Sequence, residues 1–386
     1  MSDGRPMRIV SIAHPAVSSE AGRLRYPHLA ARSDIDLHLV MPAVWKEFGR
    51  TMAAEPPVAD GLSVHVLPIR IPQAGPMNWY LHFYPALRRL LRELDPDVIH
   101  LWEEPWSIVA LQAQILRRRA ALVLEVDQNI LKRLPPPFET IRKHVLKHTD
   151  HVVSRSPDAT MVVRARGYTG PVTPIGYGVD LATFTPGPDS APARGGPFRI
   201  GYVGRLVEEK GLDDALDAMA SGASDVSLGI MGEGPYEGRL RQRVRELGLG
   251  ERVDFSGWAS PAEVAAFLRS LDALVLLTRT TAAVREQFGR VIIEAQACGV
   301  PVIGSTSGAI PDVVGEGGWI VPERDPERLR TLLNELSADR SLLRPKALAS
   351  RLNVERRFTY DAVAAAIETA CRAAAVSRSA TIAIRR

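Results

Sequence analysis

The sequence predicts an α/β protein built from two doubly wound parallel sheets. Short apolar segments alternate with helical patterns along the chain, which is typical of strand-helix-strand units. A segment rich in proline and glycine, residues 185–197, divides these units into two series. The chain has 386 residues, which is more than one hydrophobic core normally fills, so two domains are expected.

The strand candidates of both series are short apolar runs bounded by turn residues. In the first series they cover residues 8–13, 36–40, 63–67, 98–102, 121–126 and 151–154. In the second series they cover residues 198–203, 226–231, 253–255, 273–277, 301–304 and 318–321. Residues 77–94 are predicted to form one helix, because their apolar side chains recur at helical spacing. We expect that apolar stripe to belong to the core.

The second series opens with a pattern that suits an anion. Its first strand ends at Gly204, and Arg205 follows at the carboxyl end of that strand. Lys210 and Gly211 then open the next helix. A helix N-terminus with a nearby lysine attracts phosphate, and an arginine fork binds phosphate oxygens in pairs. A solvated loop is the alternative, but the joint placement of the two cations favours phosphate binding.

Two carboxylates frame the start of a later helix. Glu294 lies on the predicted helix and Glu286 in the loop before it, with Phe288 and Gly289 at the helix N-terminus. A carboxylate accepts hydrogen bonds from vicinal hydroxyls, so one acid can hold a ribose and the other a hexose. Apolar neighbours around Glu294 argue against plain surface charge. With the anion pattern, these residues predict a pocket for a nucleotide sugar.

Further motifs follow in order across about residues 198 to 325. They include Tyr202-Val203-Gly204-Arg205, Met231-Gly232-Glu233-Gly234-Pro235, Val253-Asp254-Phe255-Ser256-Gly257, Ala297-Cys298-Gly299-Val300-Pro301 and Gly308-Ala309-Ile310-Pro311-Asp312. On these motifs the second half of the chain resembles glycosyltransferase family 4, while a looser match in the first half rests on residues 96–100 and 178–186. The resemblance implies a GT-B fold, in which two Rossmann-like domains face each other across a cleft.

The resemblance also implies roles for residues of the second half. Arg205 and Lys210 would hold the diphosphate, Glu294 the ribose and Glu286 the transferred sugar. The remaining donor contacts would come from main-chain amides, glycine loops and the border of the base: Phe288, Gly289, Gly204, Gly232 and Trp258. The pair of glycines in the Gly232 loop lacks the rest of a dinucleotide fingerprint, so a dehydrogenase is not predicted.

The first half departs from the family pattern. Where many members carry a glycine pair after the first strand, this chain has Gly22 alone, which we expect to contact the donor. Trp102 stands where several members have a histidine. Acceptor-side candidates are the polar or aromatic residues at the carboxyl ends of strands: His14, His100, Trp102, Glu103 and Asp127. Two of these have plainer alternatives, because Asp127 suits a helix cap and His100 suits a buried histidine bonded to backbone.

Composition excludes several other classes. Cys298 and Cys371 are the only cysteines and both lie in apolar helical runs, so neither a disulfide framework nor a cysteine metal site is predicted. Short acidic pairs at residues 34–36 and 95–97 precede strands, at the wrong end for an active site, and no metal or other cofactor is expected. No apolar stretch approaches the length of a membrane span, and the polar N-terminus lacks a secretory signal. A cytoplasmic protein is expected.

The isoelectric point of 9.2 and the formal charge of +4 are mildly basic and do not imply nucleic acid. Basic residues gather at residues 117–119, at 132–133 and on a helix over residues 139–148. They suit either contact with the inner face of a membrane or an ordinary amphipathic helix packed on the sheet. Both readings stay open at this point.

These inferences give a domain plan. We expect an acceptor-binding domain, a linker, a donor-binding domain, a helix that crosses back to the first domain and a frayed tail, over residues 1–187, 188–197, 198–358, 359–376 and 377–386.

The predicted activity is retaining transfer of a hexose from a UDP- or GDP-linked donor to a hydroxyl of a saccharide, lipid-linked or small-molecule acceptor. Same-face displacement without metal is expected, because no carboxylate nucleophile is identifiable and the cations can stabilise the departing phosphate. The alternatives are a catalytically weak donor-binding or partner subunit, and a phosphorylase or epimerase on the same fold.

Overall fold

The computed structural model describes residues 5–17, 23–47, 50–70, 77–187, 196–222 and 225–384. The chain divides into two compact units, which we call unit 1 (residues 1–178 and 360–386) and unit 2 (residues 179–359). Gly22 and residues 188–195 of the expected linker lie outside the described residues. Residues 179–187 were expected in the first domain but belong to unit 2, because Val179 donates its N–H to Phe358 O at 2.9 Å.

Unit 1 is built on a seven-stranded sheet in the order β5-β2-β1-β6-β7-β8-β9, with every neighbouring pair parallel. The strands are β5 (Leu62–Leu67), β2 (Ile35–Pro42), β1 (Met7–Ala13), β6 (Val98–Trp102), β7 (Ala121–Val126), β8 (His151–Ser154) and β9 (Val172–Pro174). A separate antiparallel pair joins β3 (Val44–Glu47) and β4 (Arg50–Ala53). The sequence predicted the six longer strands of the sheet but not β9 or the antiparallel pair.

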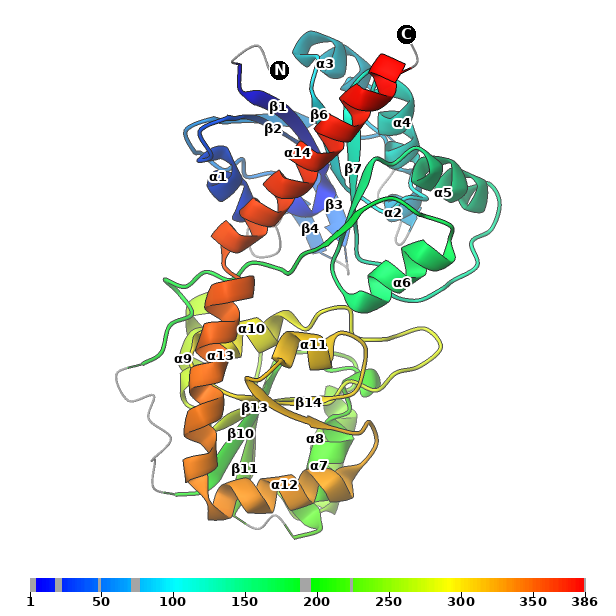
Figure 1. Ribbon diagram of the computed structural model, residues 1–386. Helices are drawn as coiled ribbons and strands as arrows, with labels where there is room; N and C mark the ends of the chain where they lie inside the picture. Colours follow the sequence, from blue (N-terminus) through cyan, green and yellow to red (C-terminus); the bar gives the residue numbers. More distant parts are fainter. Residues whose placement is uncertain are drawn as a thin grey trace. The chain divides into compact units, whose positions relative to one another are not determined.

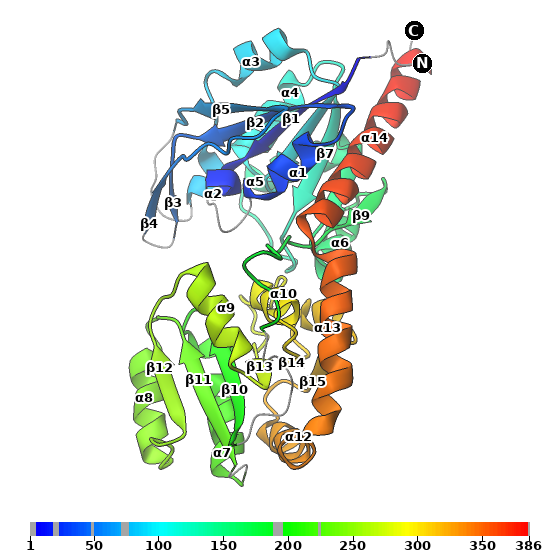
Figure 2. The ribbon, with the colours of Figure 1, turned by 90° about the vertical axis from the view of Figure 1, so that its left-hand side faces the viewer.

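Helices cover both faces of this sheet (Figures 1 and 2). They are α1 (Arg25–Ala30), α2 (Asn78–Leu81), α3 (Leu87–Leu94), α4 (Ile108–Leu116), α5 (Phe138–Lys147), α6 (Pro157–Ala165) and α14 (Tyr360–Ile384), with a 3-10 turn at His14–Val17. Alternate residues of β1 serve the two layers: Ile9 packs in one apolar cluster and Val10 in the other. This alternation is what a parallel sheet covered on both faces requires.

Two helix predictions in unit 1 need correction. Residues 77–94 do not form one helix, because the chain is extended at His82 and Pro85 cannot continue the hydrogen-bond ladder. Residues 377–384 are not frayed but continue α14, which runs to Ile384. Alanine-rich composition favours this helix, and hydroxyl-to-carbonyl bonds inside it, such as Thr381 to Ser377 O at 3.0 Å, satisfy polar groups locally.

Unit 2 is built on a six-stranded parallel sheet in the order β12-β11-β10-β13-β14-β15. The strands are β12 (Val253–Ser256), β11 (Val226–Met231), β10 (Phe198–Val203), β13 (Ala273–Leu276), β14 (Val302–Ser305) and β15 (Gly318–Val321). The helices are α7 (Leu212–Ala220), α8 (Glu237–Glu246), α9 (Pro261–Arg269), α10 (Arg290–Ala297), α11 (Ile310–Val314), α12 (Pro326–Ala338) and α13 (Leu343–Arg357). All six strands lie where the sequence predicted them, within a residue or two at each end.

The strand order of each sheet reverses at one place. In unit 1 the chain builds outward from β1 to β2 and β5, then restarts at β6 on the other side of β1. In unit 2 it builds outward from β10 to β11 and β12, then restarts at β13 on the other side of β10. Loops that leave the carboxyl ends of the two central strands diverge at such a switch point and open a crevice for ligands. The α/β fold class and the doubly wound topology are therefore confirmed.

Candidate active site

The switch point of unit 2 brings together two of the predicted donor residues. Lys210 ends a 3-10 turn (Glu208–Lys210) in the loop after β10, and Glu286 lies in the loop after β13. Lys210 Nζ lies 2.6 Å from Glu286 Oε2. Thr278, which follows β13 and is fully buried, donates its hydroxyl to the same carboxylate oxygen at 2.7 Å. The sequence predicted the lysine and the glutamate but missed the threonine.

Glycines shape the loops beside this pair. Gly211 has φ of +68°, and a Cβ there would lie 2.1 Å from the carbonyl oxygen of Leu277. Gly232 has φ of +140°, and a Cβ there would lie 2.0 Å from the carbonyl oxygen of Gly204. The loops after β10, β11 and β13 therefore approach backbone to backbone, which only glycine permits. This approach explains why residues 211 and 232 are glycines, and the contact of Gly204 and Gly232 with a donor remains a prediction.

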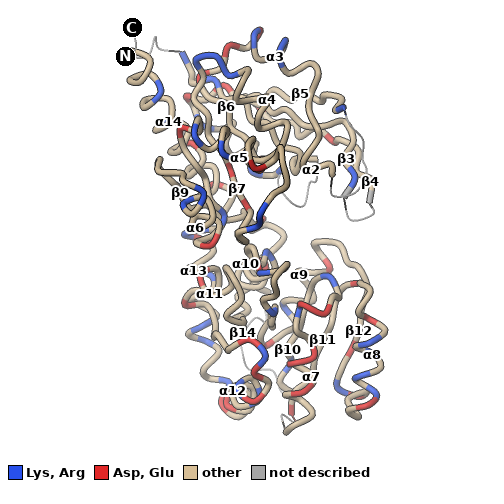
Figure 3. Tube along the Cα trace, turned by 90° about the vertical axis from the view of Figure 1, so that its right-hand side faces the viewer, with Lys and Arg blue, Asp and Glu red and all other residues tan. Residues whose placement is uncertain are grey.

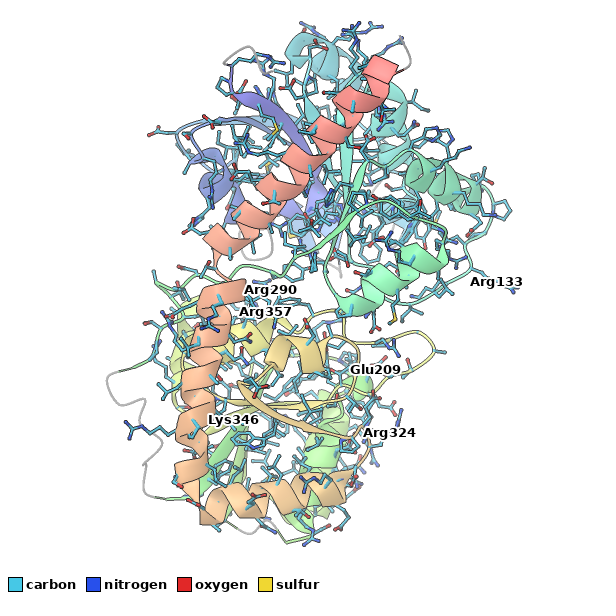
Figure 4. The ribbon with its side chains drawn as sticks, in the orientation of Figure 1. Arg133, Glu209, Arg290, Arg324, Lys346 and Arg357 are labelled. Carbon is cyan, nitrogen blue, oxygen red and sulfur yellow. The ribbon has the colours of Figure 1, made fainter. Side chains whose placement is uncertain are left out.

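The helix α10 begins as the sequence predicted. Gly289 is its N-cap with φ of +78°, and no side chain caps the first turn. The ring of Phe288 is buried and packs edge-to-face on Phe358, with centroids 5.5 Å apart. The ring of Phe288 is therefore not available to a ligand, and a contact through its main-chain amide remains a prediction. Glu294 lies on α10 and is approached at 3.6 Å by Arg290, which Figure 4 labels.

Two other donor candidates lie at the same end of the sheet. Arg205 is exposed and follows β10; the hydroxyl of Tyr202 donates to its carbonyl oxygen at 2.8 Å and fixes the turn. Trp258 follows β12 and is 57% exposed, an unusual state for an indole. Its main-chain N–H donates to Glu233 Oε1 at 3.1 Å. Both residues stand where the strands of unit 2 end, which is the expected side for a ligand.

The switch point of unit 1 holds a second pair. His14, in the turn after β1, bonds Glu103, after β6, twice: its backbone N–H donates to Oε1 at 3.0 Å, and its ring Nδ1 lies 2.8 Å from Oε2. His82, which the sequence did not single out, brings its Nε2 to 3.4 Å from the same carboxylate. Two imidazoles and a carboxylate are also ligand types that a divalent metal accepts. Among the described residues, His14, His82 and Glu103 form the group whose ligand atoms lie close enough together to hold a metal ion.

His100 lies inside a buried charge network of unit 1. Its Nδ1 lies 2.9 Å from the hydroxyl of Ser11, and its Nε2 lies 3.1 Å from Glu125 Oε2. Arg25 donates to the same glutamate at 2.8 Å, and Arg155 is a further ion-pair partner. Burial lowers the pKa of His100 to about 3, with help from the two arginines, so the ring is neutral. The structure therefore places His100 in the interior, as its plainer alternative has it, but the ring bonds the side chains of Ser11 and Glu125 rather than backbone.

Trp102 and Asp127 belong to the same network. The guanidinium of Arg25 stacks 3.7 Å from the centroid of Trp102, a cation–π contact, and Trp102 Nε1 donates to Asp127 Oδ2 at 3.2 Å. Arg155 Nε donates to Asp127 Oδ1 at 3.0 Å. Trp102 is buried while Asp127 is partly exposed, so of these two only the carboxylate can meet a ligand directly.

Glu104 holds the loop that carries Asp127. Its Oε1 accepts the N–H groups of Asp127 and Gln128 at 2.9 and 2.8 Å. Its Oε2 is enclosed and has no hydrogen-bond partner among the described residues. Burial, with the nearby charge of Asp127, raises the pKa of Glu104 to about 8. No pattern in the sequence distinguishes this residue from its neighbour Glu103.

Comparison with known proteins agrees with the fold. Residues 28–183 match the family model described as Glycosyltransferase Family 4, and residues 188–351 match the model described as Glycosyl transferases group 1. The chain is 32% identical over 275 residues to a GDP-mannose-dependent phosphatidylinositol monomannoside mannosyltransferase of Mycolicibacterium smegmatis, covering 66% of this chain and 70% of that protein. It is 34% identical over 193 residues to WcaL of Escherichia coli K12, assigned by its name to colanic acid biosynthesis, covering 48% of this chain. The match spans about half of WcaL, 47% of its length.

Among solved structures, the chain is similar to Anabaena Alr3699/HepE in complex with UDP. The TM-score is 0.70 at 18% identity, and the match covers 94% of this chain and 98% of that one. The fold and the two family matches define a glycosyltransferase of the GT-B fold. The chain belongs to glycosyltransferase family 4. Among the described residues, no helix is both long enough and apolar enough to cross a bilayer.

Proposed function

We propose that this protein is a retaining hexosyltransferase that moves a sugar from a nucleoside diphosphate to a hydroxyl acceptor. The observation that carries the proposal is the Lys210–Glu286 pair at the switch point of unit 2. A cation for phosphate and a carboxylate for sugar hydroxyls stand side by side where doubly wound sheets bind ligands. The M. smegmatis relative is named as GDP-mannose-dependent and the Anabaena structure holds UDP, which supports a GDP- or UDP-linked donor.

In this proposal the leaving group is stabilised by fixed charges. The transition state builds positive charge on the sugar ring and negative charge on the departing phosphate. Arg205, Lys210 and the main-chain amides at Phe288 and Gly289 would neutralise that phosphate, while Glu286 positions the sugar and Glu294 the ribose. Displacement would occur on the same face, with the leaving phosphate helping to accept the proton of the acceptor hydroxyl. No metal is needed for these steps, so transfer is expected to persist in EDTA.

The test is a donor screen. Binding of UDP-, GDP-, ADP- and dTDP-sugars is measured by thermal shift, since a ligand that binds only the folded state raises the melting temperature. One donor should respond, and the response should be lost in Arg205→Ala and kept in Arg344→Ala, a control in α13. If no nucleotide or nucleotide sugar binds, the proposal fails. Binding without transfer to any acceptor would favour a donor-binding partner subunit, and product without acceptor would favour an epimerase.

We further propose that unit 1 touches an anionic membrane surface, where a lipid-linked acceptor would be met. The support is the loop before α5: Leu131 is 55% exposed beside the exposed Lys132 and Arg133, and Lys143 and Lys147 are exposed on α5. Figure 3 marks these basic positions in blue, and Figure 4 shows Arg133 pointing away from unit 1. An apolar side chain flanked by cations suits a headgroup layer.

Co-sedimentation with vesicles of anionic and of neutral lipid tests this contact. Binding to the anionic vesicles should fall in the combined variant Lys132→Glu and Arg133→Glu. The control reverses Arg88 and Arg92, which are exposed on α3. If the variant and the control bind the anionic vesicles equally, the membrane contact is contradicted, and α5 is an ordinary amphipathic helix packed on the sheet.

A further inference from the structure

The tautomer of His14 follows from its partner. Burial by itself would raise the pKa of Glu103, but the charge that His14 and His82 carry when protonated, together with their hydrogen bonds, outweighs burial and lowers that pKa to about 2. Glu103 is therefore a carboxylate, which accepts hydrogen bonds and donates none. In the neutral imidazole of His14, Nδ1 must then carry the proton that bonds Glu103, and Nε2 keeps its lone pair.

His82 locks this arrangement from the interior side. Its Nδ1 lies 2.7 Å from the carbonyl oxygen of Asn78, so that nitrogen must donate. Its Nε2 faces Glu103 at 3.4 Å with no aligned hydrogen bond, and the ring is fully buried. Glu103 is thus held between two rings and cannot turn away from His14.

The open nitrogen of His14 lies on the ligand side of the sheet. The ring is 15% exposed, and no described residue bonds its Nε2. Trp45 stacks against the ring, with centroids 4.4 Å apart, and restricts its rotation. The residue follows β1 at the point where the strand order of unit 1 reverses. A fixed lone pair in this place accepts from a hydroxyl and repels phosphate or carboxylate oxygens, which have no proton to give.

We propose that Nε2 of His14 accepts a hydrogen bond from a hydroxyl of the glycosyl acceptor, with Glu103 and His82 as positioning residues that hold the required tautomer. This role rests on the proposed function and refines it, since it assigns an uncharged hydroxyl of the acceptor to unit 1. It also gives His82 a reason for its place beside a buried carboxylate.

Glu103→Gln is the sharpest variant. The oxygen of the amide must still accept the backbone N–H of His14, so its NH2 group would face the ring Nδ1. The imidazole would then carry its proton on Nε2 and donate where the wild type accepts, as loss of a carboxylate does in other histidine dyads. The expected result is a fall of about tenfold or more in kcat/KM for the acceptor. Binding of the nucleoside diphosphate should be unchanged.

Nitrogen-15 NMR of the histidine rings reads the tautomer without any substrate. The wild type should show an unprotonated Nε2 at His14, and Glu103→Gln should show a protonated one. His28→Gln is the matched control, because His28 also bonds a carboxylate through Nδ1, that of Asp361 at 2.9 Å, but on the exposed surface. It should leave transfer at the wild-type rate.

Each contrary outcome is distinct. Wild-type transfer in both His14→Ala and Glu103→Gln, or a wild-type His14 protonated on Nε2 alone, would overturn the proposal. So would stoichiometric Zn²⁺ binding that is lost in His82→Gln, because Nδ1 of His14 would then be a metal ligand. Absence of nucleotide binding in the wild type would contradict the proposed function itself. The role of His14 would then fail as well, because it rests on that function.

Discussion

Lys210 and Glu286 form an ion pair across the switch point of unit 2, with 2.6 Å between the ammonium nitrogen and the carboxylate oxygen. Their side chains are only 20% and 12% exposed, so the attraction is less screened than on an open surface. In the proposed function, a nucleotide sugar has to separate them, giving its phosphate to the lysine and its hydroxyls to the carboxylate. Phosphate binding and sugar binding would then be coupled through one ion pair.

This coupling predicts opposite effects of one substitution. Glu286→Gln should lower transfer about tenfold or more, because a charge-assisted hydrogen bond to the sugar is worth roughly 1.5–3 kcal/mol. It should leave the affinity for a nucleoside diphosphate without sugar unchanged or higher, since Lys210 is held less tightly. Isothermal titration beside a transfer assay measures both. Weaker diphosphate binding in Glu286→Gln would mean that Glu286 supports Lys210 rather than competes for it.

Thr278 should matter through its hydroxyl. Thr278→Val removes the 2.7 Å bond to Glu286 and is expected to lower kcat/KM about fivefold, from a typical hydrogen bond of ~1 kcal/mol. Thr278→Ser keeps the hydroxyl and should retain most activity. Steady-state kinetics of the two variants, with melting temperatures as a check on folding, decide the matter. Wild-type activity in Thr278→Val would contradict this role for the hydroxyl.

Gly211 and Gly248 offer a matched pair of backbone tests. Both have φ near +68°, at +68° and +67°, but a Cβ at Gly248 meets nothing within 4 Å, whereas one at Gly211 meets Leu277 O at 2.1 Å. Gly248→Ala should therefore cost about 1 kcal/mol from its backbone conformation alone. Gly211→Ala should cost more and weaken nucleotide binding, because the Lys210 loop must shift. Urea unfolding and nucleotide titration of both variants give the comparison, and equal losses would contradict it.

Glu104 should make stability depend on pH. Its pKa is raised to about 8 in the folded protein from an ordinary 4.5, so its contribution is fully present below about pH 4.5 and is lost as pH rises through 8. Glu104→Gln keeps an oxygen for the N–H groups of Asp127 and Gln128 but cannot ionise. We expect the variant to match the wild type at pH 5 and to exceed it at pH 9, by on the order of 2–4 kcal/mol. Unfolding curves that shift equally at both pH values would refute this.

Much of the fold could be read from the sequence because buried parallel strands are short apolar runs with clear boundaries. The same clarity placed Lys210 after β10 and Glu286 in the loop before α10. His82 was hidden because the apolar spacing of residues 77–94 suggests a continuous helix, and Pro85 was the signal that it breaks. Thr278 stood at a predicted strand end, but a hydroxyl there shows its role only once Glu286 is seen to fold back onto it.

The acceptor side was harder to read for a physical reason. In the sequence pattern, all four acceptor-side residues at these two strands lie at carboxyl ends: His14, His100, Trp102 and Glu103. In the structure, His100 and Trp102 are buried in an ion network with Arg25 and Glu125. Pairing between strands distant in sequence decides which end residues meet solvent, and a single sequence does not give that pairing. Thus Arg25, one of the most buried arginines of the chain, could not be distinguished from a surface cation.

The discontinuity of unit 1 sets an order of events during synthesis. One of its apolar clusters joins Ile9 and Leu37 to Val363, Ile367 and Cys371, which leave the ribosome after every residue of unit 2. Because domains generally fold as units while the chain emerges, unit 2 can close first and unit 1 must wait with part of one face of its sheet uncovered. The half that is translated first is then the half that is completed last, and nascent chains stalled before α14 should expose that face to chaperones.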